Sequence, residues 1–130
     1  MKTSAPSLYP NNAVGERVTE YSEQHSLGIP REIAEYHTHI YNTHPKSNYM
    51  ISSFQSQAHV FLARAIGARR ILEIGVYVGY SSMVWSHAVG PEGKVVGLEF
   101  SPEYAGLAKE ALGARGFTNV EVLEGDALQT

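Results

Sequence analysis

The second half of this 130-residue chain alternates short apolar runs with helical stretches, and that alternation limits the folds open to it. The apolar runs cover residues 71–75, 94–99 and 120–123, and helical patterns fill residues 80–89 and 102–115 between them. Strand, helix, strand, helix, strand with short connections is typical of parallel βαβαβ units. Right-handed crossovers favour the strand order 3-2-1, with helices packed on the sheet. We therefore predict an α/β fold with a parallel half-sheet.

The first half is helical and more polar. Residues 1–12 indicate a loose arm, and residues 13–44 predict two helices separated by Gly28 and Pro30. A third helix is expected over about residues 54–66, with its apolar side chains at helical spacing: Ala58, Phe61, Leu62 and Ala65. We divide the chain into an N-terminal arm with helices, 1–48, and a partial ligand-binding domain, 49–130.

Composition excludes several classes of protein. Hydrophobic residues make up 43% and charged residues 18%, as in ordinary globular domains. The net charge of −3 provides no basic surface for nucleic acid. No apolar run approaches the ~18 residues of a membrane span, and residues 1–6 lack the apolar segment of a secretory signal. With no cysteine either, we expect a cytoplasmic domain without membrane or nucleic-acid partners.

Candidate binding residues follow the three expected strands. Gly75 and Gly79 flank a tight turn where a ligand can approach the backbone, and the next helix begins with amides and the Ser81 hydroxyl, which can hold a carboxylate. Glu99 ends the neighbouring strand, where an acid can accept hydrogen bonds from both ribose hydroxyls of a nucleoside. Asp126 follows the third strand, where it can meet an adenine edge. The pattern predicts a nucleoside site.

Two common nucleotide sites are disfavoured. The Gly-Lys-Ser/Thr triplet of a phosphate-binding P-loop does not occur. A dinucleotide fingerprint needs glycine where Tyr77 stands, and a second nucleotide-binding half is lacking, which argues against an NAD-linked oxidoreductase. The carboxylate of Glu73, just before the turn, disfavours pyrophosphate but suits the α-ammonium of S-adenosylmethionine, and Tyr77 would lie near its cationic sulfonium.

Three segments resemble the cofactor-binding half of class I methyltransferases: ILEIGVYVGYSS, GKVVGLEFSPEYAGLAKEAL and NVEVLEGDAL. The similarity is greatest to the catechol and caffeoyl-coenzyme A O-methyltransferase type, especially fungal members acting on small molecules, and covers about residues 49–130. It implies a truncated Rossmann-like domain that binds S-adenosylmethionine.

The resemblance also implies roles for individual residues. Around the methionine part of the cofactor it would bring Glu73, Gly75, Tyr77, Gly79 and Ser81. Glu99 would bind ribose, and the adenine pocket would be formed by Phe100, Asp126 and Ala127. The segment from Met50 to Ser52 would pass near the methyl group.

The family's catalytic and metal-binding positions follow later strands, so the resemblance assigns no catalytic residue and no metal ligand to this chain. A divalent metal is expected only in a full-length enzyme, and this chain alone would be inactive. In the family the first strand pairs with a fourth, so we expect another copy, a missing C-terminal half or rearranged N-terminal helices to cover its edge. The alternative function is a non-catalytic oligomerising module with a vestigial nucleoside site.

The remaining histidines and aromatic residues receive structural interpretations. His37 and His39 would point about 200° apart on a helix and cannot chelate a metal together. His59 and His87 are expected to be packing or surface residues. The core is expected to include Phe61, Met83 and Trp85.

Overall fold

The computed structural model describes residues 9–26 and 28–129. In the described residues, three α-helices and a short 3-10 helix precede the first strand, and one α-helix connects each pair of successive strands. In chain order the elements are α1 (Asn12–Gln24), α2 (Arg31–Thr43), η1 (Ser47–Tyr49), α3 (Ser53–Ala65), β1 (Arg70–Ile74), α4 (Tyr80–Val89), β2 (Lys94–Glu99), α5 (Pro102–Ala114) and β3 (Val120–Glu124).

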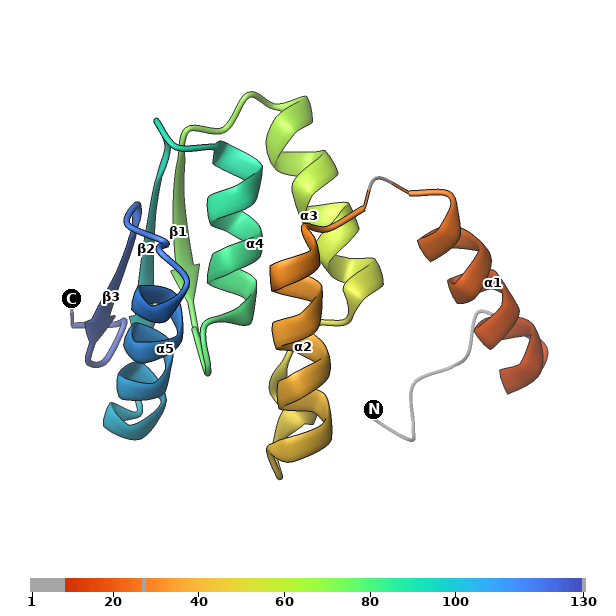
Figure 1. Ribbon diagram of the computed structural model, residues 1–130, viewed down its shortest axis with the longest axis horizontal. Helices are drawn as coiled ribbons and strands as arrows, with labels where there is room; N and C mark the ends of the chain where they lie inside the picture. Colours follow the sequence, from red (N-terminus) through yellow and green to blue (C-terminus); the bar gives the residue numbers. More distant parts are fainter. Residues whose placement is uncertain (1–8, 27, 130) are drawn as a thin grey trace.

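The sheet is a parallel three-stranded unit in the order β1-β2-β3, so the predicted βαβαβ topology is confirmed. Figure 1 shows α4 and α5 against the sheet, α2 and α3 beyond α4, and α1 at the far end of the molecule. The register aligns Glu73, Gly97 and Val122 across the three strands, and all three are buried. One face of the sheet therefore forms the core with α4 and α5.

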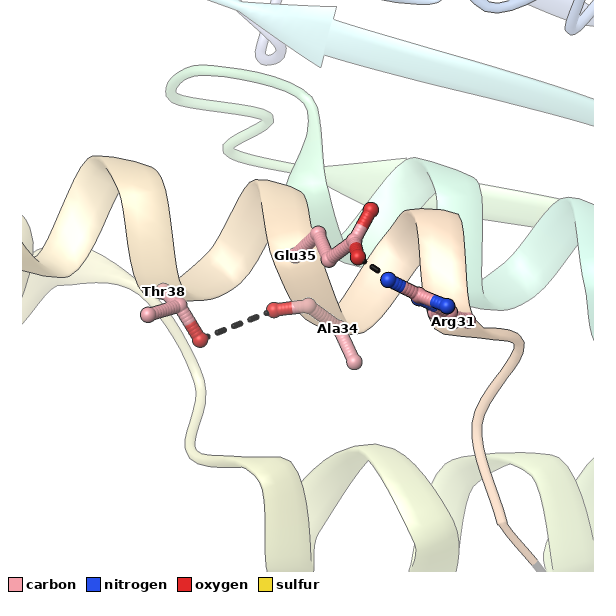
Figure 2. Close-up of polar contacts among 4 residues, drawn as sticks. All are labelled: Arg31, Ala34, Glu35 and Thr38. Atoms are coloured by element: carbon pink, nitrogen blue, oxygen red, sulfur yellow. Dashed lines mark hydrogen bonds and ion pairs between the residues drawn. The ribbon is translucent and has the colours of Figure 1, made fainter.

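Helix α2 ties the N-terminal region to the turn that follows β1. Its buried stripe is Ile33, Tyr36 and Ile40, and the Tyr36 hydroxyl donates to the carbonyl of Val78 at 2.7 Å. Its exposed side carries the Arg31–Glu35 ion pair of 2.7 Å (Figure 2). Exposed i,i+4 pairs contribute only about 0.3–0.5 kcal/mol, so the buried stripe determines where α2 sits.

Helix α3 differs from the sequence prediction. Its buried residues are Ser56, Val60 and Ala63, whereas Phe61, expected in the core, is 68% exposed. Ala58, Leu62 and Ala65 are exposed as well. Small side chains face α4 because they let the two helix backbones approach, and the bulky residues consequently point outward. Met83 is fully buried as expected, and Trp85 is half-buried.

The opposite face of the sheet is exposed at its two outer strands, β1 and β3. Leu72 and Ile74 of β1 are 65% and 71% exposed, and Leu123 of β3 is exposed as well. The expectation that rearranged N-terminal helices cover β1 is therefore wrong for the described residues: α2 and α3 lie beyond α4 instead (Figure 1). Within residues 9–26 and 28–129, no helix has the length and apolarity needed to cross a lipid bilayer.

Candidate functional site

The carboxyl ends of the three strands meet at one edge of the sheet. The Gly75 amide, just after β1, donates to the Leu98 carbonyl at 2.8 Å, and the Gly125 amide, just after β3, donates to the Glu99 carbonyl at 2.9 Å. The segments that follow each strand therefore start side by side. This is the edge where parallel α/β sheets bind ligands.

Glu99, at the end of β2, holds the turn that follows β1. Its Oε2 accepts the backbone N–H groups of Val76 at 2.9 Å and Tyr77 at 2.7 Å, and its Oε1 accepts that of Ser101 at 2.9 Å. A carboxylate offers about four acceptor positions. Three are used here by described residues, which leaves roughly one for a ligand hydroxyl. The second ribose hydroxyl expected from the sequence would need a rearrangement of these bonds.

Glu73 is a buried carboxylate next to a cavity. Its side chain accepts a hydrogen bond from the Ser82 hydroxyl. Burial raises the pKa of Glu73, and hydrogen bonding from Ser81, Ser82 and Trp85 opposes that rise, whereas the charge of Glu99 adds to it. Burial therefore makes ionisation of this carboxyl group less favourable, and a cation paired with it would oppose that effect.

The cavity has a volume of about 200 Å³. It lies between the end of β1, the start of α4 and the segment that runs from η1 into α3. Of the residues predicted for the site it is lined by Met50, Glu73, Gly75, Tyr77 and Ser81. A space of this size accommodates the amino-acid portion of a ligand, since each water of liquid volume occupies about 30 Å³.

The two glycines of the turn serve different purposes. Both have positive φ, +85° at Gly75 and +89° at Gly79. A Cβ on Gly75 would meet no atom within 4 Å, so its backbone is open to a ligand, whereas a Cβ on Gly79 would lie 3.3 Å from the Ala108 Cα. Gly79 thus lets α4 approach α5 closely, and its contribution is to packing.

Tyr77 is the one described non-glycine residue with a positive φ, 54°. Its hydroxyl shares a hydrogen bond with Nδ1 of His44, at the end of α2. Its ring packs edge-on against the rings of Tyr49 and Tyr104, with centroids 5.6 Å and 4.8 Å away. The two hydrogen bonds that backbone N–H groups donate to Glu99, together with this aromatic packing, hold the strained backbone in place.

The other predicted site residues lie outside the cavity. Ser52 caps α3 in a capping box with Gln55. Phe100 follows Glu99 and is 75% exposed, at the same edge of the sheet. Asp126 and Ala127 lie in the turn after β3, where Asp126 accepts the Leu128 amide at 2.9 Å.

Sequence reasoning did not assign His59 and Tyr80 to the site, although both line the cavity. His59, on α3, stacks on the ring of Trp85, and the buried hydroxyl of Tyr80 contacts the Ser56 hydroxyl at 2.8 Å. The available signal was the row of small residues at positions 56 and 63, which marks the face of α3 turned toward α4. His59 borders that row.

Known proteins provide an independent comparison. The family described as O-methyltransferase matches residues 23–130. The O-methyltransferase ankF of Aspergillus thermomutatus is 35% identical over 117 residues, 87% of this chain and 48% of that protein. A catechol O-methyltransferase of Mycobacterium tuberculosis is 42% identical over 81 residues, 62% of this chain and 37% of that protein.

A solved structure extends the likeness to three dimensions. The Podospora anserina methyltransferase PaMTH1, solved with S-adenosylhomocysteine bound, has a TM-score of 0.85 and 33% identity. The match covers 95% of this chain and 54% of that one. This chain thus spans about half the length, or less, of the relatives it matches. Because the family match extends over most of its residues, the chain belongs to the O-methyltransferase family.

Proposed function

We propose that this chain is the cofactor-binding portion of an S-adenosylmethionine-dependent O-methyltransferase that acts on small phenolic acceptors. The observation that carries the proposal is the meeting of Glu73, Gly75 and Glu99 beside one cavity at the carboxyl edge of the sheet. Family membership supports the methyl transfer, and the S-adenosylhomocysteine bound to PaMTH1 supports the cofactor. The name of the mycobacterial relative supports a phenolic acceptor.

The described residues suit such a cofactor. Glu73 offers a buried negative charge to the ammonium, and pairing with that cation removes the cost of ionising it. Glu99 offers an acceptor to a ribose hydroxyl, the exposed ring of Phe100 offers a stacking surface to adenine, and Asp126 and Ala127 complete the adenine side. Met50 lines the cavity where the sulfur end of the cofactor would lie.

The cofactor supplies a methyl group on a positively charged sulfur, which an acceptor oxygen takes by in-line displacement. The role of this chain is to bind and orient that donor. In the described residues, no three His, Asp or Glu side chains gather as a metal site, and we assign neither a metal ion nor a catalytic base to them. We therefore propose that residues 1–130 alone bind cofactor without turnover, in the cytoplasm, with residues 49–130 as the binding unit.

A second candidate is a non-catalytic module that self-associates, and the open face of the sheet favours it. Exposed Leu72, Ile74 and Leu123 form an apolar surface beside an edge strand, and such edges pair readily with other chains. We propose that a second copy, or a C-terminal half of the same fold, covers this surface.

Calorimetric titration with S-adenosylhomocysteine tests the first candidate, with NAD⁺ as the control ligand. Binding of the former alone is expected, and Glu99→Gln is expected to weaken it at least several-fold. Sedimentation across a dilution series without ligand tests the second. A monodisperse monomer that binds S-adenosylhomocysteine excludes the module, whereas a stable assembly without binding excludes the cofactor site.

A further inference from the structure

His59 is a titratable residue for which the proposed roles leave no use. It lies on α3, which packs against α4, and its ring is stacked on Trp85 with centroids 4.4 Å apart and planes 9° from parallel. The same ring borders the cavity that Glu73 and Ser81 line. Stacking fixes the plane in which the two imidazole nitrogens lie before any ligand arrives.

The two nitrogens of His59 have different surroundings. Nδ1 is buried and has no hydrogen-bond partner among the residues that the structure describes. Nε2 does not belong to that buried set, and none of the hydrogen bonds between described residues engages it. Nε2 is therefore the nitrogen of this ring that keeps some accessibility, and the ring itself borders the cavity.

The protonation of His59 follows from its burial. Desolvation lowers the pKa of the imidazole, so the ring is neutral near pH 7 and carries a single N–H. A proton on Nδ1 would stay without an acceptor, which costs free energy in a buried setting. With a ligand acceptor in the cavity, the proton is better placed on Nε2, where the ring acts as a hydrogen-bond donor.

The charge arrangement of the cavity points to the acceptor. Glu73 provides a carboxyl group on one wall, whose negative charge is stabilised when a cation pairs with it, and His59 provides a neutral donor at the same cavity. An α-amino acid group carries an ammonium and a carboxylate on the same carbon. Such a group satisfies a carboxylate and a donor within one cavity of about 200 Å³.

We propose that His59 is a cofactor-binding residue whose Nε2–H donates to the carboxylate of the cofactor's amino-acid portion, while Glu73 pairs with the ammonium. This inference rests on the proposed function, because it takes the ligand to be S-adenosylmethionine. It adds a side-chain donor from α3 to the cofactor contacts made by the turn and by α4.

The experiment compares two probes that share the adenosine and the thioether. S-Adenosylhomocysteine carries the amino-acid group, and 5′-methylthioadenosine lacks it. His59→Phe keeps a ring to stack on Trp85 but removes both nitrogens, and His59→Gln restores an amide donor. His87→Phe is the matched control, since His87 is half-buried on α4 and contacts Arg64 outside the cavity. Circular dichroism checks that each variant is folded.

His59→Phe is expected to weaken S-adenosylhomocysteine binding roughly 10- to 100-fold, as for a lost hydrogen bond to a charged group. The same change leaves the affinity for 5′-methylthioadenosine within about twofold, His59→Gln recovers part of the loss, and the control leaves both affinities unchanged. An equal loss for both probes means that the ring only packs, and no loss means that it makes no contact; either result overturns the inference alone. If the unaltered chain binds neither probe, the proposed cofactor site falls together with it.

Discussion

Replacement of Glu99 tests whether this carboxylate is part of the framework as well as of the site. Glu99→Ala removes the acceptor of three backbone N–H groups, of which those of Val76 and Tyr77 belong to buried residues. Hydrogen bonds to charged groups contribute about 1.5–3 kcal/mol each. Loss of the two buried hydrogen bonds alone thus predicts a decrease of about 3–6 kcal/mol in the free energy of unfolding. That is a large part of the ~5–15 kcal/mol by which a typical domain is stable.

Glu99→Gln should cost much less. The amide oxygen can still accept from Val76 and Tyr77, and only the Ser101 amide then faces an NH₂ donor, so we expect a loss of about 1–2 kcal/mol. Urea unfolding followed by fluorescence of Trp85, the only tryptophan, measures both values. Glu124→Ala is the control, because Glu124 pairs with Glu99 in the strand register but is exposed. If the free energy of unfolding of Glu99→Ala lies within about 1 kcal/mol of that of the unaltered chain, the proposed role of these hydrogen bonds is refuted.

Three further predictions follow from the packing and the electrostatics. Gly97→Ala places a Cβ 2.4 Å from a methyl group of Val76 and should destabilise the fold by about 1–3 kcal/mol. Gly106→Ala meets no atom within 4 Å and should stabilise it by about 0.5–1 kcal/mol, and thermal melts that rank the two variants otherwise contradict the packing. Tyr36→Phe removes the 2.7 Å hydrogen bond to the turn and should cost about 1 kcal/mol in urea unfolding, with no loss expected if that bond is absent in solution. Because the pKa of Glu73 is raised by folding, the free energy of unfolding should fall as pH rises from about 4.5. Glu73→Gln should abolish that fall, and the same pH profile of unfolding in the variant and the unaltered chain would contradict the prediction.

The order of the strands and helices was predictable because its signals are local. Apolar runs bounded by glycine or by charged residues predicted β1, β2 and β3 to within a residue or two, and the helical pattern over residues 102–115 predicted α5. Parallel pairing then follows from the connections, which contain helices. The turn at Gly75 was predictable for the same reason, since a positive φ beside open space needs glycine.

The face of α3 was not predictable from hydrophobicity alone. The apolar residues Phe61 and Leu62 suggested an inward stripe, but α3 meets α4 through Ser56, Val60 and Ala63. A helix–helix contact is stabilised by close approach of the two backbones as well as by burial of apolar surface, and a hydrophobic sequence pattern reports only the burial. The same error concealed His59, which was expected to be a packing or surface residue.

Only one of the two roles of Glu99 was predicted from the sequence. Its position at the end of β2 indicated a ligand acceptor, and no sequence pattern indicated that it also holds two amides of the turn. That second role depends on the φ of 54° at Tyr77, which is set by tertiary packing against His44, Tyr49 and Tyr104.

The double use of Glu99 couples cofactor affinity to the order of the turn. A ligand that takes the remaining acceptor position of Glu99 finds the Gly75 backbone open only while the bonds to Val76 and Tyr77 hold the turn. Loss of those bonds therefore lowers both stability and affinity, and the bound cofactor must stabilise the fold in return. At a ligand concentration of about 100 times Kd that stabilisation amounts to about 2.7 kcal/mol, more than the loss expected for Glu99→Gln. A Glu99→Gln chain held at about 100 times its own Kd for S-adenosylhomocysteine should consequently be at least as stable in urea unfolding as the unaltered chain without ligand, and a lower stability would contradict this coupling.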